Sequence, residues 1–154
     1  MKYIPWNELP SVINQIESHF NQLSDHSSEM RFFSKKTPEM IRSWLDNMLN
    51  QTIHEHHWIM KMSPEGNVIG LGQISSDSKT TEIAISISDE YQGMGIGREI
   101  LSKLIEKCKD LGYKKVFVCC LPSNKVVISI LKSLGFCMEY DRFSNGFHGH
   151  LELV

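Results

Sequence analysis

The residues with the clearest chemical potential form a glycine-rich stretch, Tyr91-Gln92-Gly93-Met94-Gly95-Ile96-Gly97-Arg98. Glycine permits positive φ angles and lets a ligand approach the backbone closely. An amphipathic pattern begins near Ile96, and a helix that starts there presents unpaired N–H groups at its positive end. The stretch therefore predicts a binding site for an anion of about the size of a pyrophosphate.

The glycine spacing excludes two common phosphate-binding motifs. In the dinucleotide fingerprint G-x-G-x-x-G, the third glycine would fall on Arg98 or Ile100. In the P-loop G-x-x-x-x-G-K-[ST], the second glycine would also fall on Arg98. The pattern that remains is Gln92-x-x-Gly95-x-Gly97.

A strand must precede this stretch and a helix must follow it. Residues 81–88 alternate Ile83, Ile85 and Ile87 with polar or small residues that include Glu82, which predicts a strand with an acid on one face. After the glycines, apolar residues recur at helical spacing and stop before a terminating glycine. They are Ile96, Ile100, Leu101, Leu104, Ile105 and Cys108, followed by Gly112.

The next element is a continuously apolar run at 116–121, which predicts a strand buried on both faces. A strand, a helix and a second strand in this order imply a right-handed crossover and a parallel pair. The run ends at Pro122-Ser123-Asn124, and a shorter helix then ends at Gly135-Phe136. Two final strands are expected over 136–141 and 147–153.

The N-terminal third is predicted to be helical. A first helix, with Ile16 and Phe20 on its apolar stripe, ends near the polar run 24–28. Thr37 and Pro38 are typical cap and first-turn residues of a second helix. Two strands over 57–62 and 67–74, joined by a turn that contains proline and glycine, indicate a hairpin.

Composition limits the class of protein. A chain of 154 residues with 41% hydrophobic content predicts one domain over 1–154. The net charge of −2 gives no reason to expect nucleic acid or an anionic membrane surface as a partner. With no long apolar run and no signal-peptide pattern at the N-terminus, we expect a cytoplasmic protein without membrane segments.

Cysteines and histidines do not form a pattern typical of metal sites. The four cysteines lack C-x-x-C spacing, so we expect free and mostly buried thiols. His54, His56 and His57 cluster in the sequence, and His148 and His150 alternate near the end. We interpret both groups as polar positions on strands and predict no metal site.

The order of these features resembles the GNAT N-acetyltransferase superfamily from about residue 55 to the C-terminus. A hairpin, a strand bearing an acid, Gln92-x-x-Gly95-x-Gly97, a helix, a buried strand, Asn124 and a helix ending at Gly135-Phe136 follow one another as in that family. The resemblance implies a three-layer α/β (α+β) fold. Its sheet would be mixed and mostly antiparallel, with one parallel pair that splays apart and helices on both faces.

A second resemblance involves residues 23–33, Leu-Ser-Asp-His-Ser-Ser-Glu-Met-Arg-Phe-Phe. This stretch is similar to the segment before the GNAT core in Pat-type protein lysine acetyltransferases. The same residues also allow a simpler interpretation. Ser24 or Ser27 would cap a helical turn, Arg31 would make a surface ion pair, and Phe32 and Phe33 would pack in the core.

The GNAT resemblance implies roles for particular residues. Glu82 matches the position of the general base, which often acts through a water molecule. Main chain at Ile85 and Ile87 would bind the pantetheine arm of acetyl-CoA, the expected co-substrate. The pyrophosphate would be held by the glycine turn, which comprises Gln92, Gly93, Met94, Gly95, Ile96, Gly97 and Arg98. Asn124 would contact the cofactor arm, although capping of the following helix explains that asparagine equally well.

One position departs from the common GNAT pattern. Many family members carry a tyrosine on the helix before Gly-Phe, thought to protonate the departing thiolate, and Leu131 occupies that position here. Leucine cannot donate a proton. The proton would come from water or another group such as Ser129, with Tyr140 a distant substitute, unless the thiolate leaves unassisted. Pat-type enzymes also commonly lack this tyrosine.

The sequence therefore predicts an acyl-CoA-dependent N-acyltransferase that transfers acetyl directly to a primary amine. A protein lysine is the first-choice acceptor, and a small amine such as a polyamine, an aminoglycoside or an amino acid is the second. The rival hypothesis is a non-catalytic GNAT fold that binds acyl-CoA as a sensor. A monomer and a homodimer are both compatible with the sequence.

Overall fold

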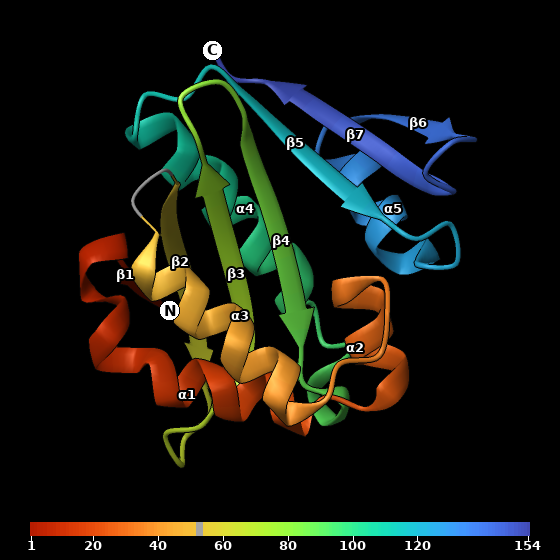
Figure 1. The fold of residues 1–154 in the computed structure, drawn as a ribbon. Helices are drawn as coiled ribbons and strands as arrows, with labels where there is room; N and C mark the ends of the chain where they lie inside the picture. The colour runs from red at the N-terminus through yellow and green to blue at the C-terminus, as the bar shows by residue number, and fades with distance from the viewer. Residues whose placement is uncertain (52–53) are drawn as a thin grey trace.

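In the computed structural model, which describes residues 1–51 and 54–154, seven strands form one sheet in the order β1-β2-β3-β4-β5-β7-β6 (Figure 1). Among these strands β4 and β5 are the one parallel pair, and every other neighbouring pair is antiparallel. The strands are β1 (Lys2–Ile4), β2 (Glu55–Met62), β3 (Val68–Ser76), β4 (Thr81–Ile87), β5 (Lys115–Cys120), β6 (Cys137–Asp141) and β7 (Gly146–Glu152). The helices are α1 (Leu9–Gln22), α2 (Asp25–Phe32), α3 (Pro38–Asn50), α4 (Ile96–Asp110) and α5 (Lys125–Ser133).

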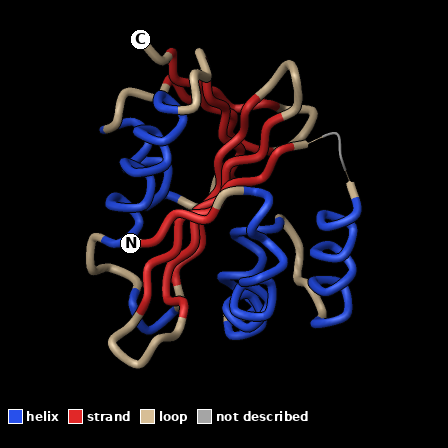
Figure 2. Tube along the Cα trace, turned by 90° about the vertical axis from the view of Figure 1, so that its left-hand side faces the viewer, coloured by secondary structure: helices blue, strands red, loops and turns tan. Residues whose placement is uncertain are grey.

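Helices cover both faces of the sheet (Figure 2). One apolar cluster packs α1 and α3 against β2 and β3 and includes the fully buried Phe20 and Trp58. A second cluster packs α4 and α5 against the other face and includes Ile100 and Leu131. The mixed sheet, the single parallel pair and the two helical layers confirm the predicted fold class.

The N-terminal part contains two elements that the sequence did not predict. The polar run after α1 does not end the helical region, because Ser24 caps the new helix α2 by accepting a hydrogen bond from the Ser27 N–H at 3.1 Å. Strand β1 at the N-terminus adds to the edge of the sheet by pairing with β2. The predicted helix start at Thr37-Pro38 is confirmed, with Thr37 accepting from the Met40 N–H.

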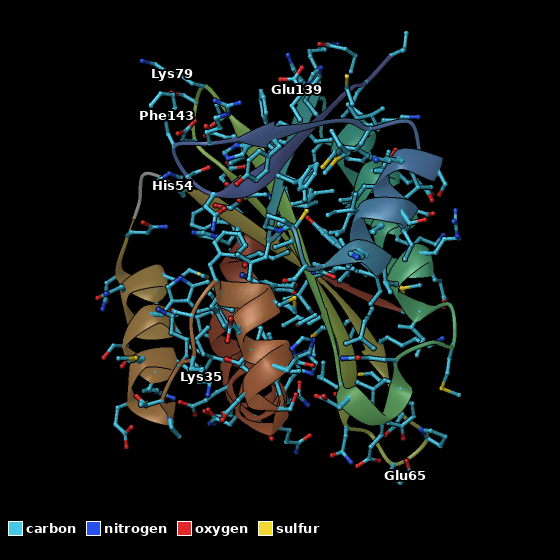
Figure 3. All side chains as sticks on the ribbon, turned by 90° about the vertical axis from the view of Figure 1, so that its right-hand side faces the viewer. Lys35, His54, Glu65, Lys79, Glu139 and Phe143 are labelled. Atoms are coloured by element: carbon cyan, nitrogen blue, oxygen red, sulfur yellow. The ribbon has the colours of Figure 1, made fainter. Side chains whose placement is uncertain are left out.

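The prediction that β5 is buried on both faces is wrong. Val116, Val118 and Cys120 are buried against α4 and α5, whereas the alternate residues, including Phe117 and Cys119, are half-buried. The helices α1 to α3 lie over β2 to β4 and leave the same face of β5, β7 and β6 without a helical cover (Figure 1). At the turn between β6 and β7, Phe143 projects fully into solvent (Figure 3).

Helix α4 packs closely against the centre of the sheet. Gly70 and Gly72 of β3 face this helix, and a Cβ at Gly72 would lie 2.6 Å from Ile100 Cγ2 and 2.9 Å from Leu104 Cδ1. These distances are shorter than van der Waals contact, so a Cβ at Gly72 would force the side chains of Ile100 and Leu104 to move. The two glycines thus set how near α4, which begins at the glycine turn, approaches β3.

We expect Gly72→Ala to lower the free energy of unfolding by about 1–3 kcal/mol, because α4 must shift to accommodate the methyl group. Urea denaturation followed by circular dichroism measures this change. Gly146→Ala is the matched control, since a Cβ at Gly146 would lie no nearer than 3.5 Å to a non-adjacent described residue, the contact being with the Cys120 carbonyl oxygen. Equal stability of the two variants would contradict the packing argument.

Candidate active site

The site forms where β4 and β5 separate. Their parallel pairing consists of one residue pair, Glu82 with Phe117. A cleft of about 590 Å³ lies between α2, the C-terminal half of β4, the glycine turn and the start of α5. Its walls include residues from positions 26 to 130, so the fold brings together segments that are far apart in the sequence.

The direction of the backbone in β4 follows from one hydrogen bond. The Ser88 N–H donates to the carbonyl oxygen of Ile69, a residue of β3, so it points toward that strand. N–H groups alternate along a strand, so those of Ile85 and Ile87 point to the opposite side, toward the opening beside β5. The Ile87 carbonyl also points there, because it accepts a hydrogen bond from Gln92 Nε2 at 3.0 Å. Main-chain donors and acceptors at both predicted positions are therefore directed into the cleft.

The glycine turn has the backbone conformation that its sequence predicts. Gly93 and Gly95 have φ angles of 76° and 83°, in the left-handed region that favours glycine. Gly95 immediately precedes α4, so the N–H groups of Ile96, Gly97 and Arg98 begin the helix without intrahelical acceptors. The cleft therefore contains a helix N-terminus with an open approach to its backbone donors.

A carboxylate connects this turn to α2. Asp89 accepts hydrogen bonds from the Ser24 N–H at 3.1 Å, from Ser24 Oγ at 2.7 Å and from Ser27 Oγ at 3.0 Å. Partial burial opposes ionisation, but these hydrogen bonds outweigh it and hold the pKa of Asp89 below its usual value. Gln92 Nε2 also donates to Ser27 Oγ at 3.0 Å, which makes Ser27 a second link.

Nearly all the predicted cofactor-binding residues line this one cleft. They are Ile85, Ile87, Gln92, Gly93, Gly95, Ile96, Gly97, Arg98 and Asn124. Met94 is the exception, because its side chain is 67% exposed and does not line the cleft. Asn124 precedes α5 without a side-chain capping hydrogen bond to the described residues, so the capping explanation is not supported.

Glu82 lies near the N-terminal end of β4, where that strand pairs with β5, and is not part of the cleft lining. It is exposed, while its neighbour Ile83 is buried on the opposite face of β4. The face of β5 that α1 to α3 leave uncovered lies next to Glu82. A carboxylate in this position is accessible to a molecule that approaches over β5, from the part of this same face that α1 to α3 leave uncovered.

Sequence reasoning did not identify the contribution of α2 to the cleft. His26, Ser27, Met30 and Arg31 line it from this helix, and Lys125 lines it from the start of α5. The similarity of residues 23–33 to Pat-type enzymes was the available signal. Under the simpler interpretation Arg31 would make a surface ion pair, but it forms none with the described residues. Phe33 is exposed, whereas Phe32 packs against the core.

The residues considered as leaving-group acids lie outside the cleft. Leu131 is fully buried in the core beneath α5. Ser129 is exposed on α5, and the Tyr140 hydroxyl donates to Asn145 Oδ1 at 2.6 Å. In the part of the chain that the structure describes, neither of these two side chains lines the cleft.

The sequence cluster of histidines is divided between the two faces of β2. His56 contacts Gln51 and Gln73, whereas His57 Nδ1 lies 2.6 Å from the Tyr3 hydroxyl. Burial lowers the pKa of His56 to about 4, with further lowering by the neighbouring histidines. Within residues 1–51 and 54–154, no three His, Cys, Asp or Glu side chains are grouped to hold a metal ion.

Comparison with known proteins identifies the family. A family model described as the acetyltransferase (GNAT) family matches residues 20–136. The chain belongs to this family. None of the helices in the described ranges is both long and apolar enough to span a membrane. GNAT membership supports the expectation of an N-acyltransferase.

Two curated relatives match over different lengths of this GNAT chain. Acetyltransferase Pat of Mycolicibacterium smegmatis is 26% identical over 133 residues, which cover 82% of this chain and 39% of the relative. The L-amino acid N-acyltransferase MnaT of Escherichia coli is 38% identical over 58 residues, 37% of this chain and 33% of the relative. The matched regions thus span less than half the length of either relative.

Solved structures have the same GNAT fold. The GNAT domain of S. lividans PAT superposes with a TM-score of 0.80 at 16% identity, covering 98% of this chain and 89% of that one. The spermidine N-acetyltransferase from Vibrio cholerae, solved in complex with CoA and spermine, has a TM-score of 0.72 at 14% identity and coverages of 98% and 94%.

If the cleft binds an acyl-CoA, as GNAT membership implies, we expect Asp89→Ala to weaken that binding several-fold, because α2 and the glycine turn lose the carboxylate that joins them. Isothermal titration calorimetry measures the dissociation constant. Asp110→Ala, at the exposed C-terminal end of α4, removes an equal charge and serves as the control. An unchanged dissociation constant in Asp89→Ala would show that the link does not support the binding surface.

Proposed function

We propose that this chain is an acetyl-CoA-dependent N-acetyltransferase that transfers the acetyl group directly to a primary amine. The cleft at the separation of β4 and β5 is the observation that carries this proposal. Three features line this one surface: the N-terminus of α4, backbone groups of β4 that point into the opening, and Asn124. Glu82 lies beside it at the point where the two strands pair.

The extended shape of acetyl-CoA fits the order of these groups. The N–H groups from Gly93 to Gly97 would bind the pyrophosphate, since the Gln92 N–H already donates to the Asp89 carbonyl at 3.3 Å. The cations of Arg98 and Lys125 would add attraction for its charge. The pantetheine arm would lie along the main chain of Ile85 and Ile87, as an added strand does at a sheet edge. This direction leads the thioester toward Glu82.

Glu82 would act as the general base, directly or through a water molecule. A lysine-like amine with a pKa of ~10.4 is deprotonated in only about one molecule in a few thousand at pH 7. Removal of its proton is therefore needed before it attacks the thioester. The exposed carboxylate at the end of β4 is accessible to such an amine, and positioned proton transfer contributes about 10²–10⁴ in rate.

The main chain would stabilise the tetrahedral intermediate. The Ile87 N–H points into the cleft and would donate to the thioester oxygen as negative charge develops on it. A single donor of this kind contributes about 3 kcal/mol in comparable sites. Collapse of the intermediate then forms the amide and releases the CoA thiolate, which leaves unassisted or takes a proton from water.

A protein lysine is our preferred acceptor, supported by the resemblance of residues 23–33 to Pat-type protein lysine acetyltransferases and by the match of 82% of the chain to Acetyltransferase Pat. A small amine is the second candidate. It is favoured by the local match to an L-amino acid N-acyltransferase and by the fold shared with a spermidine N-acetyltransferase.

Calorimetric titration with acetyl-CoA, followed by addition of a panel of lysine peptides, polyamines, aminoglycosides and amino acids, tests the activity. We expect binding and then release of free thiol, detected by a chromogenic disulfide. The acceptor that triggers release identifies the substrate class. Binding without release for every acceptor would favour an acyl-CoA sensor, and absence of binding would refute the assignment of the cleft.

We expect Glu82→Gln to lower kcat by about 10²-fold or more at pH 7, because the amide cannot accept the proton. The dissociation constant of acetyl-CoA should stay within about two-fold, since Glu82 does not line the cleft. Steady-state kinetics and calorimetry measure the two effects. Glu139→Gln, an exposed acid on β6, is the control, and equal activity of the two variants would remove Glu82 from the mechanism.

A further inference from the structure

Arg31 of α2 places a positive charge in the wall of the cleft. Its guanidinium carbon lies 4.8 Å from the centroid of Phe32 and 5.6 Å from the centroids of both Phe20 and Trp44. Cation–π contacts are strongest where water is excluded, and guanidinium is the cation that tolerates such a site best. Burial lowers the pKa of Arg31 to about 10, which leaves it cationic at neutral pH.

The guanidinium of Arg31 has more hydrogen-bond donors than its protein partners use. It carries five N–H donors in a planar fork. Nη2 donates to Gln73 Oε1 at 2.6 Å, and the aromatic rings offer no lone pair on oxygen or nitrogen. No carboxylate in residues 1–51 and 54–154 forms a salt bridge with it. Donors therefore remain for a ligand in the cleft, and burying a charge without a partner is costly.

Gln73 holds Arg31 in one position. A guanidinium only donates, so the amide presents its oxygen to Arg31 and its nitrogen to His56 Nδ1, which lies 3.0 Å away. His56 can accept this hydrogen bond because burial lowers its pKa to about 4 and keeps the ring neutral. The arginine is thereby fixed in place before any ligand arrives.

Arg31 lies away from the glycine turn, toward the end of the cleft where the reaction is proposed. Ser27 accepts a hydrogen bond from Gln92 beside that turn, and Arg31 follows one helical turn of about 5 Å further along α2. Its partner Gln73 is opposite Ala84 in the β3–β4 pair. The guanidinium is thus held near the middle of β4, at a distance from the site proposed for the pyrophosphate.

Other cations around the cleft have a different place or a partner. Arg98 and Lys125 line the cleft at the glycine turn and the start of α5. Lys115 and His150 adjoin Phe117 on β5 and β7 and are not part of the cleft lining. Lys115 already forms a salt bridge with a carboxylate of β7. Among the lysines and arginines that line the described cleft, Arg31 is therefore the one placed beside the middle of β4.

Glu82 lies on the same face of the sheet as the partner of Arg31. Ser75 is opposite Glu82, so Gln73 and Glu82 are diagonal neighbours, a relation that separates Cβ atoms by about 7–8 Å. An acid on β4 and a cation held over the adjoining strand are complementary to a molecule that carries an amine and a carboxylate close together. An amine alone would leave the guanidinium without a counterion.

We propose that Arg31 binds a carboxylate of the acceptor and so selects amines that have an acid group beside them. This inference rests on the proposed function and names the chemistry of its acceptor. The carboxylate belongs either to a free amino acid or to an aspartate or glutamate next to the target lysine of a protein. The planar fork of Arg31 binds it through two parallel N–H···O bonds, and the amine is directed toward Glu82.

Matched acceptors that differ in one carboxylate test the selection. The pairs are L-leucine and isoamylamine, L-lysine and cadaverine, and two lysine peptides that differ by glutamate or glutamine beside the lysine. We expect kcat/KM for acetyl transfer to be about tenfold higher or more for the acid-bearing member. A preference within the amino-acid pairs or within the peptide pair identifies the source of the carboxylate.

Variants assign the preference to Arg31. Arg31→Met keeps an apolar side chain between the rings and should bring the ratio within each pair to about one. Arg31→Lys keeps the charge without the planar fork and should give an intermediate ratio. Arg42→Met removes an exposed cation of α3 outside the cleft and should leave the ratio unchanged. Arg31→Gln replaces Arg31→Met if near-ultraviolet circular dichroism shows that the aromatic packing is lost.

Binding without turnover separates this proposal from the proposed function. The same pairs are titrated by calorimetry into the protein with excess CoA, and we expect the acid-bearing member to bind about tenfold more tightly or more, except in Arg31→Met. Equal or undetectable binding together with equal kcat/KM within every pair, or a preference that Arg31→Met retains, would overturn the role of Arg31. Selective binding with transfer to no acceptor would support that role and refute the proposed function.

Discussion

The parallel contact between β4 and β5 is the constraint on which the site depends. Elsewhere in the described sheet, neighbouring strands satisfy one another's backbone groups over several residues. Here pairing stops after Glu82 and Phe117. Unpaired backbone groups inside a protein are costly unless they find other partners. The separation therefore creates both an opening and a need for hydrogen bonds, which an extended ligand with amide groups can meet.

The elements around the separation of β4 and β5 form the walls of the cleft. Gly70 and Gly72 hold α4 against β3, and the glycine turn closes the far end of the cleft. Asp89 joins that turn to α2, which forms the opposite wall. Residues of α2 precede the glycine turn by about sixty positions, so the cleft is a product of tertiary structure and not of one motif.

Local chemistry explains which features were predictable from the sequence. The glycine turn and its following helix depend on φ angles and periodicity that are encoded within a few residues, as Gly93 and Gly95 show. Helix α2 was missed because its sequence is polar and lacks a clear apolar stripe. Its position depends instead on Ser24 and Ser27 reaching Asp89, more than sixty residues away.

The environment of Arg31 and the exposure of β5 were missed for the same reason. A continuous apolar run does not say whether a second layer covers both of its faces, and α1 to α3 end before reaching β5. Likewise, a single arginine in a polar segment gives no sign that Phe20, Phe32 and Trp44 will surround it. Both facts depend on how distant elements meet.

The tight contact of α4 with β3 has a consequence for the length of the acyl group. Since a Cβ at Gly72 would already overlap Ile100, the helix is in full contact with the sheet, and the turn at its start is fixed relative to β4. The end of the cleft at the glycine turn, where we propose that the pyrophosphate binds, is thus a rigid reference point. In this proposed binding mode, a longer acyl chain would extend past Glu82 onto the uncovered face of β5 and β7, and the residues there would determine whether it is accepted.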